Sequence, residues 1–159
     1  MGTPWIVTWK FQLTQPMRST WMPDVVLHLG EEDGDLLKAP FESLDKRADF
    51  LVAGPPCPPW SGCGSHTGLK DARAQVFLRV LEWVFYFARC GGLLGCILEN
   101  VVGIKTEKNG FESAADKFLR SLRTYIPEFS WDVETLHAVD YLNPQTRVRV
   151  FLKGFRRTV

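Results

Sequence analysis

Residues 54–61 read Gly-Pro-Pro-Cys-Pro-Pro-Trp-Ser, a cysteine with two prolines on each side. Each proline fixes its own φ angle and removes a backbone donor, so the segment is expected to form a stiff loop. The apolar run at residues 50–53 leads into it and is typical of a buried strand. A thiol on a rigid loop at a strand end is where an α/β enzyme places a nucleophile. A stiff proline turn with an incidental cysteine is the alternative for this segment taken alone.

The composition is that of an ordinary globular protein. A length of 159 residues suits one domain, and 45% hydrophobic with 23% charged residues argues against disorder. The net charge of +1 gives no global argument for a nucleic-acid partner, although the last thirteen residues contain five basic residues and no acid. The N-terminus lacks a secretory signal and no apolar stretch is long enough to cross a bilayer. We therefore expect an intracellular protein without a membrane partner.

The four cysteines do not form a recognisable metal site. Cys57 and Cys63 are separated by five residues, as are Cys90 and Cys96, and this spacing does not match the common zinc patterns. An intracellular chain would keep all four as thiols. Cys90 and Cys96 have apolar sequence neighbours and are expected to lie in the core.

Hydrophobic patterning predicts alternating strands and helices, which favours βαβ units and a largely parallel sheet. The expected strands are residues 23–28, 48–53, 93–98, 131–136 and 147–152, and the expected helices are residues 71–89 and 112–126. Cys57 and Glu99 each come just after the carboxyl end of an expected strand, with one helix between them. Because ligands bind at this edge of such sheets, the two side chains are predicted to share a site.

Four short motifs occur in a fixed order along residues 34–154. They are Gly-Pro-Pro-Cys at 54–57, Asp71-x-Arg73, Glu99-Asn100-Val101 and Gln145-x-Arg147-x-Arg149. Each motif alone is weak, but in this order and at these separations the set resembles the cytosine-C5 methyltransferases. The resemblance implies an α/β, Rossmann-like, S-adenosylmethionine-dependent methyltransferase fold, incomplete here, with a mostly parallel sheet and flanking helices.

The resemblance also implies a covalent mechanism acting on DNA. Cytosine C5 is a poor nucleophile, and addition of the Cys57 thiolate to C6 would convert the ring into an enamine that is reactive at C5. Glu99 would hold the base through N3 and the exocyclic amine and protonate N3. Arg149 would hold cytosine O2, with Arg147 giving electrostatic support. The base must be flipped out of the duplex, and Ser61 matches a position that contacts the DNA backbone.

For the cofactor, S-adenosyl-L-methionine, the resemblance implies a second group of residues. Asp35 looks like the acid that accepts a hydrogen bond from the adenine amine. Pro56 and Val76 align with apolar positions that line the cofactor pocket, and Asn100 and Val101 lie beside it.

The chain departs from the family in three places. Residue 58 is proline where the family usually has glutamine. Residues 1–30 contain no glycine-rich cofactor loop, although residues 6–11 could supply a substitute strand; without it, strand edges at the sheet centre would stay unpaired. No target-recognition region follows the Arg147–Arg149 strand. We therefore expect an N-terminal segment at residues 1–30 and a partial methyltransferase domain at residues 31–159.

Several functions remain open at this point. A fragment of a larger DNA methyltransferase is favoured, nuclear if the organism is eukaryotic. A remnant without catalysis, acting as a nucleic-acid-binding or partner module, is the next alternative. A split enzyme completed by a second chain and an RNA cytosine-C5 methyltransferase share the same motifs. An unrelated thiol hydrolase pairing Cys57 with His66 or His137 has the least support, because nothing orders a triad.

Overall fold

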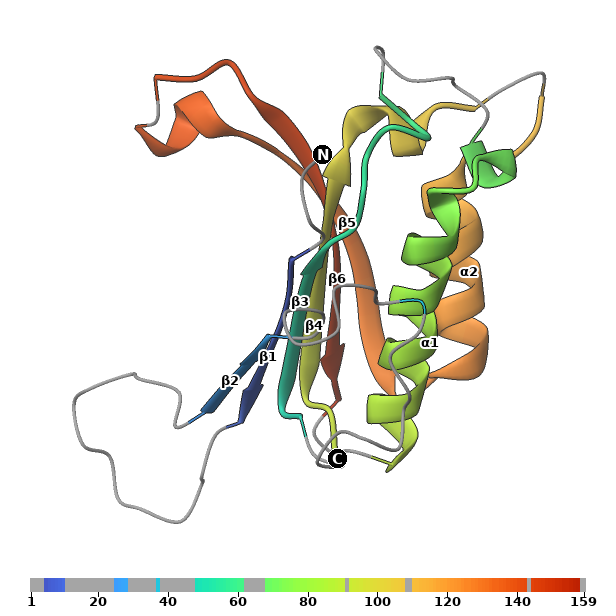
Figure 1. Cartoon of the computed structure of the whole chain (residues 1–159), viewed down its shortest axis with the longest axis vertical. Helices are drawn as coiled ribbons and strands as arrows, with labels where there is room; N and C mark the ends of the chain where they lie inside the picture. Colours follow the sequence, from blue (N-terminus) through green and yellow to red (C-terminus); the bar gives the residue numbers. More distant parts are fainter. Residues whose placement is uncertain are drawn as a thin grey trace.

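The computed structural model describes residues 5–10, 25–28, 37, 48–61, 68–90, 92–107, 110–142 and 144–157. In this part of the chain, strands form one six-stranded sheet in the order β2-β1-β3-β4-β6-β5, with two α-helices (Figure 1). The strands are β1 Trp5–Lys10, β2 Val25–His28, β3 Phe50–Gly54, β4 Gly95–Val101, β5 Phe129–His137 and β6 Val148–Arg156. The helices are α1 Ala74–Cys90 and α2 Ala114–Tyr125, and short 3₁₀ turns are η2 Gly68–Lys70, η3 Val102–Lys105 and η4 Ala138–Tyr141.

Strand directions correct one expectation from the sequence. The α/β architecture with flanking helices is confirmed, but the sheet is mixed, and among the described pairings only β3–β4 is parallel. Antiparallel pairs lie on both sides of β3 and β4, with β1 and β2 on one side and β6 and β5 on the other. β5 and β6 pair as an antiparallel hairpin, and β6 inserts between β4 and β5. Alternation of strands and helices along the chain does not reveal this insertion, because it depends on which strands pair.

β1 pairs with the edge of β3 that faces away from β4. It pairs antiparallel with β3 from Trp5 opposite Gly54 to Trp9 opposite Phe50, and β2 then pairs with β1. The substitute strand considered for residues 6–11 lies at this position, and the backbone groups of β3 therefore have partners on both sides.

Both helices lie on one face of the sheet (Figure 1). Alternate strand residues face them and are buried. On α1, apolar residues recur at helical spacing and join the same core. α2 begins at its N-cap Ser113, whose hydroxyl accepts from the Asp116 N–H at 3.2 Å. The buried strand residues are Leu51, Ala53, Cys96, Leu98, Val150 and Leu152.

The opposite face of the sheet carries polar and charged side chains. Glu99, Arg149 and Lys153 point to it, and all three are partly exposed. Because Glu99 and Arg149 are on this face, the candidate site lies away from α1 and α2, at the end of β4.

No helix of the described residues is long and apolar enough to cross a membrane.

Candidate active site

The cysteine loop follows β3 directly and is anchored to β4. Asn100 is fully buried, and its Nδ2 donates to the Pro55 carbonyl at 3.3 Å while its Oδ1 accepts from the Val101 N–H at 2.9 Å. Both polar ends of this amide are therefore hydrogen-bonded: Nδ2 ties the loop to the strand, and Oδ1 binds the backbone of β4 itself. Burial of such a group is favourable only when it is hydrogen-bonded in this way. Asn100 thus fixes the start of the loop two residues before Cys57.

The far end of the same loop is held by Trp60. The Cys57 carbonyl accepts from the N–H groups of Trp60 at 2.9 Å and Ser61 at 3.0 Å, which closes a turn. The Trp60 ring is buried and makes edge-on contacts with Phe77 and Phe118, at centroid separations of 5.4 and 6.4 Å. The turn also presses on η3, where a Cβ added at Gly103 would lie 1.8 Å from the Trp60 carbonyl oxygen. Cys57, half-buried, is therefore held between two fixed points.

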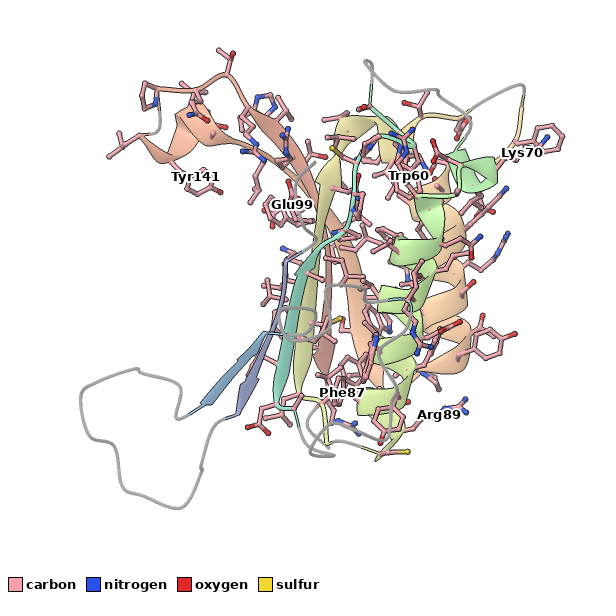
Figure 2. All side chains as sticks on the ribbon, viewed as in Figure 1. Trp60, Lys70, Phe87, Arg89, Glu99 and Tyr141 are labelled. Atoms are coloured by element: carbon pink, nitrogen blue, oxygen red, sulfur yellow. The ribbon has the colours of Figure 1, made fainter. Side chains whose placement is uncertain are left out.

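Glu99 and the two arginines meet on the open face of the sheet, where Figure 2 labels Glu99. Arg149 lies opposite Val101 on β6, so it reaches Glu99 diagonally across the strand pair. Its Nε is 2.8 Å from Glu99 Oε1, and Arg147 Nη2 is 3.9 Å from the same oxygen. The Glu99 and Arg149 side chains are 31% and 26% exposed, so the pair is partly shielded while remaining open to a ligand.

The Glu99 carboxylate also lies over the strand that leads into the cysteine loop. A Cβ built on Gly54 would be 3.4 Å from Glu99 Oε2. Gly54 precedes Cys57 by three residues, so the structure brings this acid close to the start of the loop. One detail of the prediction is wrong: β4 continues to Val101, so Glu99 lies within the strand and not beyond its end.

The remaining candidates fall into three groups. Pro56 and Ser61 are half-buried in the cysteine loop, and Val76 and Val101 are half-buried on α1 and β4. Asp35, Cys63 and His66 lie outside the described residues. His137 is exposed at the end of β5.

Comparison with known proteins assigns the family. The model of the C-5 cytosine-specific DNA methylases matches residues 28–159. The chain belongs to this family. The Type II methyltransferase M.NgoPII of Neisseria gonorrhoeae is 30% identical over 133 residues, which covers 79% of this chain and 34% of that protein. M.FnuDI of Fusobacterium nucleatum is 32% identical over 127 residues, covering 73% and 31%.

A solved structure supports the fold independently. The methyltransferase EhMeth of Entamoeba histolytica superposes with a TM-score of 0.54 at 16% identity, over 70% of this chain and 33% of that chain. At this identity the likeness concerns the fold alone. The chain spans about a third of the length of the methylases that it matches.

Most of the basic residues near the end of this methylase chain have partners inside the protein. Arg156 donates to the carbonyls of Leu93 at 2.9 Å and Ala88 at 2.8 Å, which caps the end of α1. Lys153 is ion-paired with Glu134. Arg147, 55% exposed and 3.9 Å from Glu99, is more weakly held. The basic end is therefore chiefly structural, apart from the arginines at the site.

The Asp71-x-Arg73 motif forms a local clamp before α1. Arg73 Nε and Nη2 bind the two carboxylate oxygens of Asp71 at 2.9 and 2.6 Å, and the Arg73 N–H also donates to Asp71 Oδ1. The hydrogen bond to Asp71 raises the pKa of Arg73 above its usual value.

Sequence reasoning missed the supporting contacts of the site, namely Asn100 with Pro55 and Trp60 with Gly103. In the sequence, the only signals for these contacts are Gly103 and Asn100, which follows Glu99 directly.

The cysteines differ sharply in environment, which gives a testable expectation. Cys96 is fully buried, as predicted, and burial raises the pKa of its thiol from 9.0 to about 12. Cys90 is exposed, contrary to the prediction, and it is the last residue of α1. Apolar sequence neighbours alone do not determine whether a residue at the end of a helix is covered by the rest of the chain.

In native protein treated with iodoacetamide, we expect Cys90 to be alkylated and Cys96 to react only after unfolding, because the thiolate is the reactive form. Peptide mass spectrometry gives the two rates. The raised pKa also means that the folded state keeps its proton between pH 9 and about 12 while the unfolded state loses it. Stability from this group is thus complete below pH 9 and falls as pH rises through that window. Equal alkylation rates of Cys90 and Cys96 would contradict this account.

Proposed function

We propose that this chain carries the base chemistry of cytosine-C5 methyl transfer to DNA, as part of a longer enzyme. The observation that supports it most strongly is the placement of Glu99. Its carboxylate is held by Arg149 at 2.8 Å and lies over Gly54, three residues before Cys57. A thiol and an acid are needed together, because addition at C6 is favourable only if the charge that develops on the ring is neutralised.

The proposed sequence of bond changes balances without a further reagent from the protein. The Cys57 sulfur forms a bond to cytosine C6 as the Glu99 carboxyl group gives a proton to N3, so that the ring becomes a neutral enamine with electron density at C5. After C5 has been substituted, water takes the C5 proton, the electrons of that bond return to expel Cys57 as the thiolate, and N3 returns its proton to the Glu99 carboxylate. The ring is then aromatic again and the thiolate is regenerated.

The two arginines have separate tasks in this proposal. Arg149 is fixed by its bond to Glu99 and by a bond from Nη1 to the Val148 carbonyl at 2.7 Å. A guanidinium positioned in advance needs no reorganisation when negative charge develops on cytosine O2. Arg147 is more exposed and contributes through its charge. Ser61, next to the loop, is proposed to contact the DNA backbone.

S-adenosyl-L-methionine, when bound, supplies an electrophilic methyl group. Three apolar positions that the resemblance assigns to this cofactor are among the described residues. Pro56, Val76 and Val101 are half-buried apolar side chains, suited to contact with an adenine ring. The buried Asn100 amide is already used by the backbone, so its proposed part is to position the loop and not to hydrogen-bond the cofactor. Asp35 is proposed for the adenine amine.

The proposed substrate is DNA, and an RNA cytosine is the alternative that the same residues would serve. The short match to the relatives supports a longer enzyme or a second chain that completes the cofactor side. We propose residues 31–159 as the partial catalytic domain, with β1 in residues 1–30 as its added strand. An intracellular location, nuclear in a eukaryote, follows from a DNA substrate.

A trapping experiment tests the nucleophile. The chain is incubated with S-adenosylmethionine and a pool of duplexes containing 5-fluorocytosine, whose C–F bond blocks the final elimination. We expect a covalent protein–DNA adduct that is lost in Cys57→Ser and retained in Cys90→Ser, the matched change at an exposed cysteine. Mass spectrometry locates the modified peptide. The proposal fails if wild-type chain forms no adduct, or if Cys57→Ser still forms one.

A further inference from the structure

The hairpin between β5 and β6 projects from the sheet on the side opposite α1 and α2 (Figure 1). Its neck is closed by a bond from the Ala138 N–H to the Arg147 carbonyl at 2.9 Å, directly beyond the last strand pair, His137 with Val148. The projecting part therefore begins at Arg147, which lies 3.9 Å from Glu99. In Figure 2, Tyr141 of this hairpin and Glu99 lie on the same side of the sheet.

Leu142 at the end of η4 has a backbone conformation that disfavours a leucine. Its φ is 61° and its ψ is 17°, the left-handed region, and among the described residues it is the only one other than glycine with a positive φ. Its N–H donates back to the carbonyls of Ala138 and Val139, so the turn is fixed. Glycine or asparagine would occupy this position with less strain. The leucine side chain is also 98% exposed, so no packing within the described chain offsets the strain.

Two further exposed side chains stand beside it. Val139 is 55% and Tyr141 65% exposed, and together with Leu142 they form what we call the apolar tip. Tyr141 also contributes weakly to the raised pKa of Lys153, which is due mainly to the hydrogen bond with Glu134, and this agrees with its position over the open face. Strained backbone and exposed apolar surface at one place indicate a function outside the folded core.

We propose that the apolar tip inserts into duplex DNA beside the flipped cytosine, with Leu142 as a wedge that unstacks the neighbouring base step. This inference rests on the proposed function, because it assigns the tip to the same substrate. Leucine is among the side chains that enter base steps, and an aromatic ring such as that of Tyr141 stacks on exposed bases. The exposed Arg147 at the neck supplies a positive charge for a phosphate, although Asp140 lies within the tip.

The geometry favours nucleic acid over a protein partner because the tip and the proposed base-binding residues are parts of one hairpin. Arg147 and Arg149 stand at the base of the hairpin, and the neck bond fixes the tip relative to them. A base held at Glu99 would therefore lie near DNA that the tip can reach. Base flipping needs energy to break stacking, and a wedge supplies part of it.

Three substitutions at Leu142 distinguish the effect of its side chain from the effect of its backbone conformation. Leu142→Gly and Leu142→Asn both suit the left-handed conformation and both remove the apolar wedge. Leu142→Met keeps an apolar side chain. The probes are two fluorescein-labelled duplexes of the same mixed sequence, one fully paired and one with abasic sites opposite its cytosines, where pairing is already broken. Binding is measured by fluorescence anisotropy, and folding by thermal melting.

We expect the Gly and Asn variants to bind the paired duplex about tenfold more weakly, and the abasic duplex within about threefold of wild type, since unpairing is least costly there. Leu142→Met should bind as wild type does. The melting temperature of Leu142→Gly should equal or exceed that of wild type, which excludes loss of folding as the cause.

Other outcomes overturn the wedge and are distinguishable from failure of the proposed function. Unchanged binding of Leu142→Gly to the paired duplex, or equal weakening on both duplexes, overturns the wedge alone. Reduced self-association of that variant with unchanged DNA binding would identify a protein contact and also overturn it. Wild-type chain that binds neither duplex overturns both the wedge and the proposed function.

Discussion

Gly103→Ala is expected to destabilise the fold severely. A Cβ at this position would lie 1.8 Å from the backbone oxygen of Trp60 and 2.9 Å from its carbonyl carbon, and these atoms are not the far end of a flexible side chain. Relief requires the turn at residues 57–61 to move, and Trp60 is locked against Phe77 and Phe118. We expect a loss of about 3 kcal/mol or more in the free energy of unfolding. For a chain of this size that corresponds to a melting temperature lower by roughly 6–12 °C.

The neighbouring residue provides the control. Val102 is in the same 3₁₀ turn but is 44% exposed, so Val102→Ala should change the free energy of unfolding by only about 0.5 kcal/mol. Circular dichroism melts of both variants give the comparison. A Gly103→Ala variant that melts within the error of wild type would show that Trp60 does not press on η3. The position of Cys57 would then lack its second anchor.

Motif order along the sequence predicted which residues of the candidate site would lie close together. Cys57, Glu99 and the Arg147/Arg149 pair were predicted together, and the structure joins Glu99 to both arginines on one face. Periodicity also located the helices to within a few residues, because α1 and α2 each bury a continuous apolar stripe. Such features are local, and the sequence expresses them directly.

Features that depend on distant pairing could not be predicted. The insertion of β6 between β4 and β5 follows from strand pairing and reverses the expected strand direction. The close approach of Gly103 to Trp60 joins residues that are far apart in the chain. The exposure of Cys90 depends on what packs against the end of α1. In each case the pairing or exposure depends on tertiary packing, which the local sequence pattern does not reveal.

Glu99→Gln is expected to abolish most of the base chemistry while leaving the fold intact. The amide can still accept a hydrogen bond from Arg149, which lies 2.8 Å from Glu99 Oε1. It cannot give a proton to cytosine N3, so addition of Cys57 to C6 loses its general acid. Loss of such a catalyst typically slows a reaction by about 10²–10⁴-fold. The matched control is Glu134→Gln, which removes a carboxylate that is also on the open face and ion-paired, but with Lys153.

The most direct test of a Cys57–Glu99 pair acting on one base measures exchange at C5 without any methyl donor. DNA carrying tritium at cytosine C5 is incubated with the chain, because reversible addition of a thiolate at C6 lets the C5 hydrogen exchange with water. We predict that wild type and Glu134→Gln release tritium at similar rates, that Glu99→Gln releases it about 10²–10⁴-fold more slowly, and that Cys57→Ser releases none. Absence of release by wild type, or release by Glu99→Gln at the wild-type rate, would contradict the central claim.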